Sequence, residues 1–271
     1  MRHSFASPSA ALKSYIDYYF VFENKTDNPS AIVDVFPTPG TSMVFSFGNK
    51  DIHEYTHQGK NQKPSYEFAV DTYVLKKRKF IGRNNFGILV VCFKPWAIHN
   101  FIPFHIKEVP GQRIELKDLY PNKMQQLEEK LHHAKADSER IFIIESFLLA
   151  ILKEKPISQK MLKACSMIKK SVGMMTVCDI AKKVDLSEKQ FHRNFTESTG
   201  ISPKLYSRLE RFYFAVTKMK QAQTSLTDIA LDSGYFDQAH FIHEFKNFAH
   251  ITPKEYQKNE KNAFFGHPLN S

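Results

Sequence analysis

Two parts of the chain differ in how their apolar residues are spaced. Up to about residue 110, apolar residues form short runs or alternate with polar ones, which predicts strands near 18–22, 41–47 and 85–93. From Pro121 onward they recur at steps of three and four, which predicts helices. We therefore expect an α+β chain with a β-rich first part and a helical second part.

Several finer elements follow from the same pattern. A short helix is expected near the start, because Pro8 and Ser9 precede Leu12, Tyr15 and Ile16. Later, Asn122 is expected to cap one helix, and Asp137 or Ser138 a second that runs to Leu152. This second helix is apolar on more than one face, so we expect it to be buried against the β-rich part, another subunit, or both.

One pattern is written twice between Asp179 and Tyr256. Asp179-Ile180-Ala181 recurs as Asp228-Ile229-Ala230. Seven further positions then recur in the same order: Ser187, Phe191, Phe195, Ser202, Pro203, Lys204 and Tyr206 as Asp237, Phe241, Phe245, Thr252, Pro253, Lys254 and Tyr256. A repeat that keeps cap and core positions indicates a repeated structural unit, here helix, tight turn and helix.

The turns and caps of both units can be assigned from residue type. Ser187 and Asp237 are expected to accept hydrogen bonds from the first backbone N–H groups of the second helix in each unit. Gly234 supplies the positive φ of a sharp corner. Between the units, Ser202-Pro203 begins a long helix whose inner face carries Leu205, Leu209, Phe212, Val216 and Met219. That helix would place the two units in successive major grooves, roughly 34 Å apart.

In the second helix of each unit, the phenylalanines are assigned to the side that faces the core, and the remaining positions then define the outward face. In the first unit the face carries Lys189, His192, Arg193 and Thr196. In the second it carries Ala239, Ile242, His243 and Lys246, with His240 beside them. Cationic groups can donate to phosphates and guanine edges, and small apolar groups can meet thymine methyls. For a single helix, such a stripe is equally consistent with an ordinary solvated face. Two capped copies favour DNA recognition.

Residues from about 158 to 259 resemble the C-terminal DNA-binding domain of the AraC/XylS family of transcription regulators. The resemblance rests on the segment from Gly234 to Lys246 and on Ile251-Thr-Pro-Lys-Glu-Tyr256. It implies base-reading positions at Lys189, His192 and Arg193 and at Ala239, His240 and His243. The chain departs from the family pattern at Asp185 and His250, where glycine is usual, and at His243, where arginine is common.

The first part resembles the N-terminal domain of one branch of that family. The stretch from Tyr15 to Phe22, Phe36-Pro-Thr-Pro-Gly40 and Val90-Val-Cys-Phe-Lys-Pro95 carry this resemblance. It implies a partly open, cupin-like barrel that binds a small effector or forms a homodimer. Pro156 ends the last helix of this part, so we expect a domain of residues 1–156 and a DNA-binding domain of residues 157–271.

Composition narrows the class of protein only slightly. The formal charge is +10, with the excess denser in the helical part, as a phosphate-binding surface requires. Three separated cysteines suggest neither a disulfide framework nor a metal knuckle. No signal sequence and no run of 18 apolar residues is present, so we expect a cytoplasmic protein without a membrane partner.

An enzyme is the competing interpretation. His53-Glu-Tyr-Thr-His57 matches a zinc motif that requires a helix, yet the residues around it alternate as in a strand. We therefore expect no enzyme activity, no catalytic or metal site and no cofactor, and keep as the alternative a metal-dependent β-barrel enzyme with an appended DNA-binding module. The resemblance implies double-stranded DNA and RNA polymerase as partners and an activator role, although the residues themselves do not distinguish activation from repression. The effector cannot be identified from the sequence.

Overall fold

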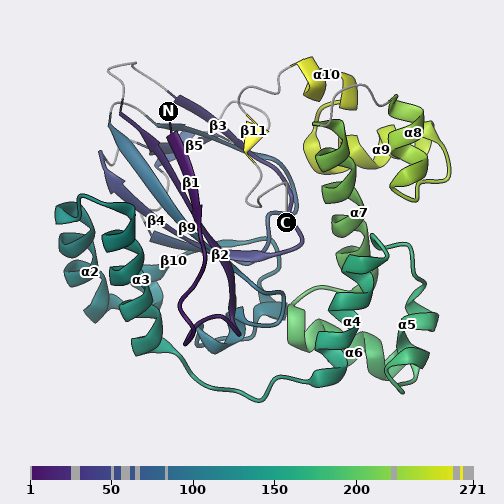
Figure 1. The fold of residues 1–271 in the computed structure, drawn as a ribbon, viewed down its shortest axis with the longest axis horizontal. Helices are drawn as coiled ribbons and strands as arrows, with labels where there is room; N and C mark the ends of the chain where they lie inside the picture. The colour runs from purple at the N-terminus through teal and green to yellow at the C-terminus, as the bar shows by residue number, and fades with distance from the viewer. Residues whose placement is uncertain are drawn as a thin grey trace.

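The computed structural model describes residues 2–25, 31–49, 52–55, 62–64, 68–82, 85–220, 225–258 and 263–264. Two β-sheets with helices at one side make up the β-rich part, and a separate group of helices makes up the helical part (Figure 1). The predicted α+β class is confirmed, with a β-rich first part and a second part that is helical except for a two-residue strand at Ala263–Phe264.

The first sheet is six-stranded, in the order β1-β2-β9-β4-β7-β10. Its strands are β1 (Arg2–Ala6), β2 (Ile16–Asn24), β4 (Thr41–Gly48), β7 (Phe68–Asp71), β9 (Phe86–Phe93) and β10 (Arg113–Glu115). The second sheet has the order β11-β3-β8-β5-β6. Its strands are β3 (Ala31–Val35), β5 (Ile52–Tyr55), β6 (Gln62–Pro64), β8 (Arg78–Gly82) and β11 (Ala263–Phe264). The predicted strands near 18–22, 41–47 and 85–93 are therefore β2, β4 and β9. These three strands are neighbours and form the centre of the first sheet.

Both faces of this centre are buried, which explains why its strands are apolar at nearly every position. Side chains on one face, such as Tyr19, Phe45 and Val91, join the main core that continues under the helices. Alternate residues such as Phe20 and Val90 form a separate cluster on the other face. A strand covered on both sides loses the alternation of a half-exposed strand.

The prediction of a helix near the start is wrong. The chain begins with β1, and residues 10–15 form turns in which the Leu12 carbonyl accepts from the N–H groups of Tyr15 and Ile16. Ile16 already belongs to β2 and pairs with Phe93 of β9. Pairing within the sheet overrides the short helical spacing.

Two helices cover one side of the first sheet, α2 (Pro121–His133) and α3 (Asp137–Ile151), while α1 (Leu116–Leu119) and two short 3-10 segments, η1 (Ile98–Asn100) and η2 (Ile106–Glu108), lie in the connections. Both helices were expected, but their predicted caps are wrong. The N-cap residues are Tyr120 and Ala136, and neither makes a side-chain cap hydrogen bond. Asp137 instead accepts from Arg2 and Ser4 of β1, so a partner distant in sequence displaces the local one.

The helical part contains α4 (Gln159–Lys170), α5 (Val177–Lys183), α6 (Glu188–Thr199), α7 (Pro203–Met219), α8 (Leu226–Asp232), α9 (Gln238–Ala249) and α10 (Pro253–Lys258). Helices α5 and α6 form the first predicted helix-turn-helix unit, and α8 and α9 the second. The long helix α7 runs between the two units (Figure 1). It begins at the predicted position, where the Ser202 hydroxyl accepts from the Leu205 N–H at 3.2 Å.

The predicted caps and turns of the two units are confirmed. Ser187 forms a capping box with Gln190, and the Asp237 carboxylate accepts from the His240 N–H at 2.7 Å. Gly234 has φ of 72°, and the two residues that stand in place of glycine, Asp185 and His250, have φ of 53° and 57°. Because Asp and His tolerate the left-handed region better than most residues, these departures preserve the backbone.

The β-rich and helical parts are connected by residues 152–158, which form neither helix nor strand. The division at Pro156 stays a prediction. The two parts also touch directly, because Ile106 of η2 packs on Gly200 at the end of α6 and the rings of Phe36 and Tyr256 meet edge to face at 5.3 Å. Among the described residues, no helix is long and apolar enough to cross a membrane.

Candidate nucleic-acid interface and inter-sheet cavity

Helix α6 presents the predicted face of the first unit to solvent. Lys189, His192 and Arg193 are exposed, and Thr196 is half-buried with its hydroxyl donating to the His192 carbonyl at 2.8 Å. Within the described part of the chain, the side chains of Lys189 and Arg193 make no hydrogen bond or salt bridge. Their donors are therefore available to an external acceptor such as phosphate or a base edge.

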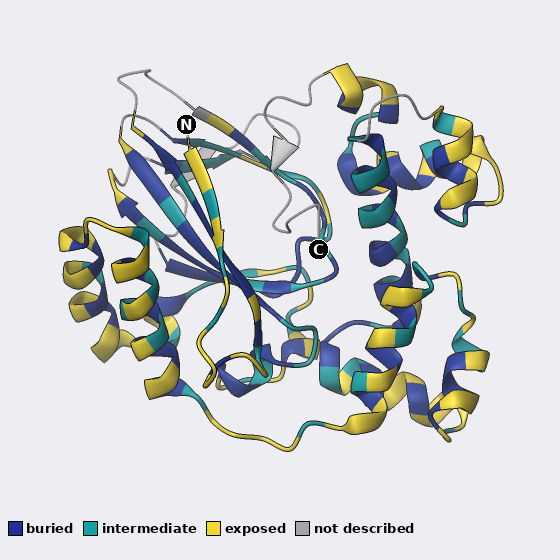
Figure 2. Cartoon of the chain, in the orientation of Figure 1, coloured by how far each residue is buried: buried dark blue, intermediate teal, exposed yellow. Residues whose placement is uncertain are grey.

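Helix α9 presents a less cationic face. Ala239, His240, His243 and Lys246 are exposed, and Ile242 is half-buried. Figure 2 shows exposed residues, in yellow, on the outer helices of the helical part, whereas the long helix α7 is mostly buried or intermediate. Apolar and imidazole groups offer fewer phosphate contacts than the lysine and arginine of α6, so the two faces differ in chemistry.

The side chain of His240 is turned toward the preceding loop. Its Nδ1 accepts from the Phe236 N–H at 3.4 Å, and its ring meets the Tyr235 ring edge to face at 5.4 Å. His243 lies one turn further along, with Nδ1 3.4 Å from the Asn247 amide nitrogen. Of the two histidines, His240 thus supports the turn in this structure.

Phe236 is a surface residue that the sequence reasoning missed. Its side chain is 87% exposed and directly precedes the cap of α9. The exposed ring therefore lies beside the start of the candidate recognition helix α9. The sequence shows Phe236 as an aromatic residue between the turn residue Gly234 and the cap residue Asp237. It was missed because it precedes α9 and so falls outside the helical spacing that defined the outward face.

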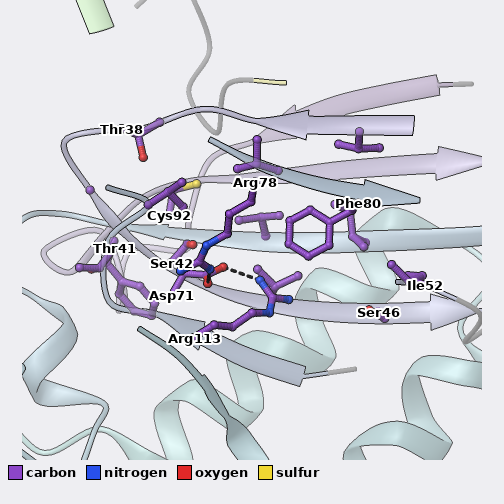
Figure 3. A pocket seen from close by; sticks show the side chains of 18 of the residues that line it. Thr38, Thr41, Ser42, Ser46, Ile52, Asp71, Arg78, Phe80, Cys92 and Arg113 are labelled. Atoms are coloured by element: carbon purple, nitrogen blue, oxygen red, sulfur yellow. Dashed lines mark hydrogen bonds and ion pairs between the residues drawn. The ribbon is translucent and has the colours of Figure 1, made fainter. Parts of the chain in front are cut away.

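A cavity of about 80 Å³ lies between the two sheets. Its apolar wall includes Val44, Phe80, Ile88 and Val90, and Figure 3 shows side chains from both sheets pointing into it. Burial raises the pKa of Cys92 in this wall to about 12, so its thiol stays protonated and is a poor nucleophile at neutral pH. The cavity can hold a small apolar group but has no thiolate to react with it.

The polar side of the cavity is an ion cluster that the sequence did not predict. Asp71 receives Arg78 Nη1 at 2.5 Å on one carboxylate oxygen and Arg113 Nη1 at 2.7 Å on the other (Figure 3). All three side chains are largely buried. The Arg113 guanidinium also lies over the Phe80 ring, 5.2 Å from its centroid, and its Nε has no hydrogen-bond partner among the described residues. An acceptor on a molecule inside the cavity could satisfy that Nε.

The histidine motif does not form the helix that zinc binding requires. His53 and Glu54 lie in strand β5, paired with β8, so they point to opposite faces of the sheet. His57 lies outside the described residues. Among the residues that are described, no group of three or more metal-ligating side chains is found.

Family comparisons match both parts of the chain. Residues 180–259 match a family described as "Helix-turn-helix domain", and residues 4–115 match a "Domain of unknown function (DUF6597)". An HTH-type transcriptional regulator of Haemophilus influenzae is 28% identical over 116 residues, which are 43% of this chain and 38% of that protein. One from Staphylococcus aureus is 31% identical over 83 residues, 31% of this chain and 11% of that protein. The chain therefore spans well under half the length of either relative.

Two solved structures are similar to this chain over different ranges. ToxT from Vibrio cholerae aligns with 89% of this chain and 97% of its own, with 13% identity and a TM-score of 0.49. The C-terminal domain of the two-component response regulator yesN from Fusobacterium nucleatum aligns with 37% of this chain and 99% of its own, with 26% identity and a TM-score of 0.35.

Proposed function

We propose that this protein, whose C-terminal part is an AraC-type helix-turn-helix domain, regulates transcription by binding double-stranded DNA sequence-specifically through α6 and α9. A small effector held in the inter-sheet cavity would modulate that binding. The predicted base-reading residues and the effector are proposals, and RNA polymerase as a partner and an activating role stay predictions of the resemblance.

The observation that carries the proposal is the pair of exposed helix faces on one rigid frame. Both α6 and α9 are the second helices of capped units, and α7 connects them through a buried face that includes Leu209, Phe212 and Val216. A recognition helix must be exposed on the side that enters the DNA groove and packed against the protein on the opposite side. Both helices meet this requirement, since Phe191 and Phe195 of α6 and Phe241 and Phe245 of α9 are fully buried.

Arg193→Ala is expected to weaken binding to the specific site by about 1–3 kcal/mol and to relax the preference at one base position. The physical reason is that a guanidinium on an exposed helix face can donate two hydrogen bonds to guanine. Titration of labelled DNA with every single-base variant of the site, at one fixed salt concentration, measures both effects.

The matched control is Lys130→Ala, which removes one exposed positive charge from α2, far along the chain from the recognition helices. It should leave the base preference unchanged. If Arg193→Ala weakens binding equally on all sequences, Arg193 contacts phosphate and does not read a base.

A homodimer formed through α3 is the second element of the proposal. Phe142 and Leu149 lie seven residues apart on one face of α3 and are 71% and 46% exposed. Covering this apolar face with the same face of a second copy would remove it from water. Light scattering at micromolar concentration should give the mass of a dimer for the parent and of a monomer for Phe142→Ser. A monomeric parent would contradict this element.

A further inference from the structure

A short connection in the β-rich part reaches the ends of both candidate recognition helices. It is the segment Thr72–Lys77, here named the strap, which links Asp71 at the end of β7 to Arg78 at the start of β8. Both flanking residues belong to the ion cluster of the inter-sheet cavity. The strap therefore begins and ends beside residues that line the cavity.

The first end of the strap is inserted into the helical part. Tyr73 is completely buried beside Thr199, Cys165 and Glu210. Thr199 is the last residue of α6, while Cys165 lies on α4 and Glu210 on α7. Burial of so large a ring contributes strongly to the free energy of an interface. Tyr73 thus anchors the strap to the end of the first recognition helix.

The other end of the strap contacts the second unit. The Lys77 N–H donates to the carbonyl of Phe248, near the end of α9, at 2.9 Å. The Lys77 ammonium is held at 3.0 Å from Asp34 of β3, and both side chains are largely buried. The carboxyl ends of α6 and α9 are therefore joined through one segment of six residues.

The cavity side fixes where the strap sits. The Asp71–Arg78 ion pair closes the loop at its two ends, and Arg113 binds the same carboxylate from β10. Val74 lines the cavity, and the Thr72 N–H donates to the Gln112 carbonyl at 3.0 Å. A molecule that pairs with either arginine competes with Asp71, and the Asp71–Arg78 contact is the ion pair that joins the two ends of the strap.

We propose that the strap couples the inter-sheet cavity to the two recognition helices. With Asp71 bound to both arginines, the strap holds the ends of α6 and α9 in one relative position. When a ligand acceptor takes Arg78 from Asp71, the two ends of the strap separate and this restraint on the two helices is lost. The inference rests on the proposed function for its biological meaning, but the mechanical coupling is a property of the chain without DNA.

Hydrogen exchange of the protein without DNA tests the coupling directly. Asp71→Asn weakens both ion pairs in the cavity wall, more than 100 residues away in sequence from the two helices measured. Amide exchange in the last turns of α6 and α9 should become about tenfold faster, an effect within the usual range of coupling between sites. Tyr73→Leu should produce the same change, and the double variant should add little, because both act through one element.

Glu23→Gln is the matched control. It weakens an ion pair in the same β-rich part, between the largely buried Glu23 carboxylate and the half-exposed Arg2 side chain. Exchange at α6 and α9 should keep the rate of the parent. The coupling is refuted if folded Asp71→Asn protein exchanges at the parent's rate in both helices, or if Glu23→Gln has the same effect as Asp71→Asn.

A second substitution keeps the test decisive if Asp71→Asn fails to fold. Arg78→Lys retains the positive charge but replaces by a single nitrogen the two guanidinium nitrogens that now bind the Asp71 carboxylate and, at 2.8 Å, the Gly111 carbonyl. It should accelerate exchange in the same two turns, and an unchanged rate there overturns the proposal. Because no DNA is present, failure of the parent to bind DNA would refute the proposed function and leave the result on the strap standing.

Discussion

Phe195→Ala is expected to destabilise the helical part by about 3–5 kcal/mol. Phe195 is fully buried, and its ring lies 5.5 Å from that of Phe191 and 5.6 Å from that of Tyr206. Removing it leaves a cavity where α6 packs on α7. Denaturant unfolding followed by circular dichroism measures the free-energy change.

Phe236→Ala provides the comparison, because it deletes the same ring from a position that is 87% exposed. Its effect on the free energy of unfolding should stay within about 0.5 kcal/mol. A loss below 1 kcal/mol for Phe195→Ala, on the order of a surface change, would mean that α6 does not pack as described.

Glu210→Gln is expected to stabilise the protein above neutral pH. Burial raises the pKa of Glu210 to about 7 from an ordinary value of 4.5, although a hydrogen bond from Tyr206 and the charge of Lys169 act in the opposite direction and Asp17 adds to the rise. Because the folded state binds this proton more tightly, the stabilisation is complete below pH 4.5 and is lost as the pH rises through about 7.

The size of the effect follows from the shift. A rise of about 2.5 in the pKa of Glu210 corresponds to a loss of about 3 kcal/mol in unfolding free energy between pH 4.5 and a pH well above 7. Glutamine cannot ionise, so Glu210→Gln should exceed the parent in unfolding free energy by up to about 3 kcal/mol at pH 8 and match it near pH 4.5. Denaturant titrations at both pH values measure the difference.

The control is Glu197→Gln, which changes an exposed carboxylate on α6. It should show little change with pH relative to the parent. If Glu210→Gln and the parent lose stability in parallel between pH 4.5 and 8, Glu210 does not titrate as its burial implies.

The helical part could be predicted from sequence because its determinants are local. The caps at Ser187 and Asp237, the positive φ at Gly234 and the spacing of phenylalanines each involve residues within a few positions of one another. In a helix, the buried positions recur every three or four residues, so they can be recognised in the sequence. The candidate recognition faces follow from the positions left after the buried ones are assigned. These positions are exposed in the structure except for the half-buried Thr196 and Ile242, and their role in reading bases stays a prediction.

The β-rich part was predictable in its strands but not in its sites. Asp71, Arg78 and Arg113 come from three strands, and only the pairing of β7 with β10 and the approach of β8 bring them together. No periodic pattern in the sequence indicates that these three side chains are in contact. The same limit explains why Asp137 was predicted as a helix cap, when its carboxylate is in fact bound by Arg2 from the start of the chain.

Selection of bound fragments from random double-stranded DNA, followed by footprinting of the enriched site, tests the central claim most directly. We expect a shared sequence with two protected segments on one side of the duplex, about one helical turn or roughly 34 Å apart, one for α6 and one for α9. Arg193→Ala should lose preference within one segment only. No enrichment over random DNA would contradict sequence-specific binding, and a single protected segment would contradict recognition by both helices.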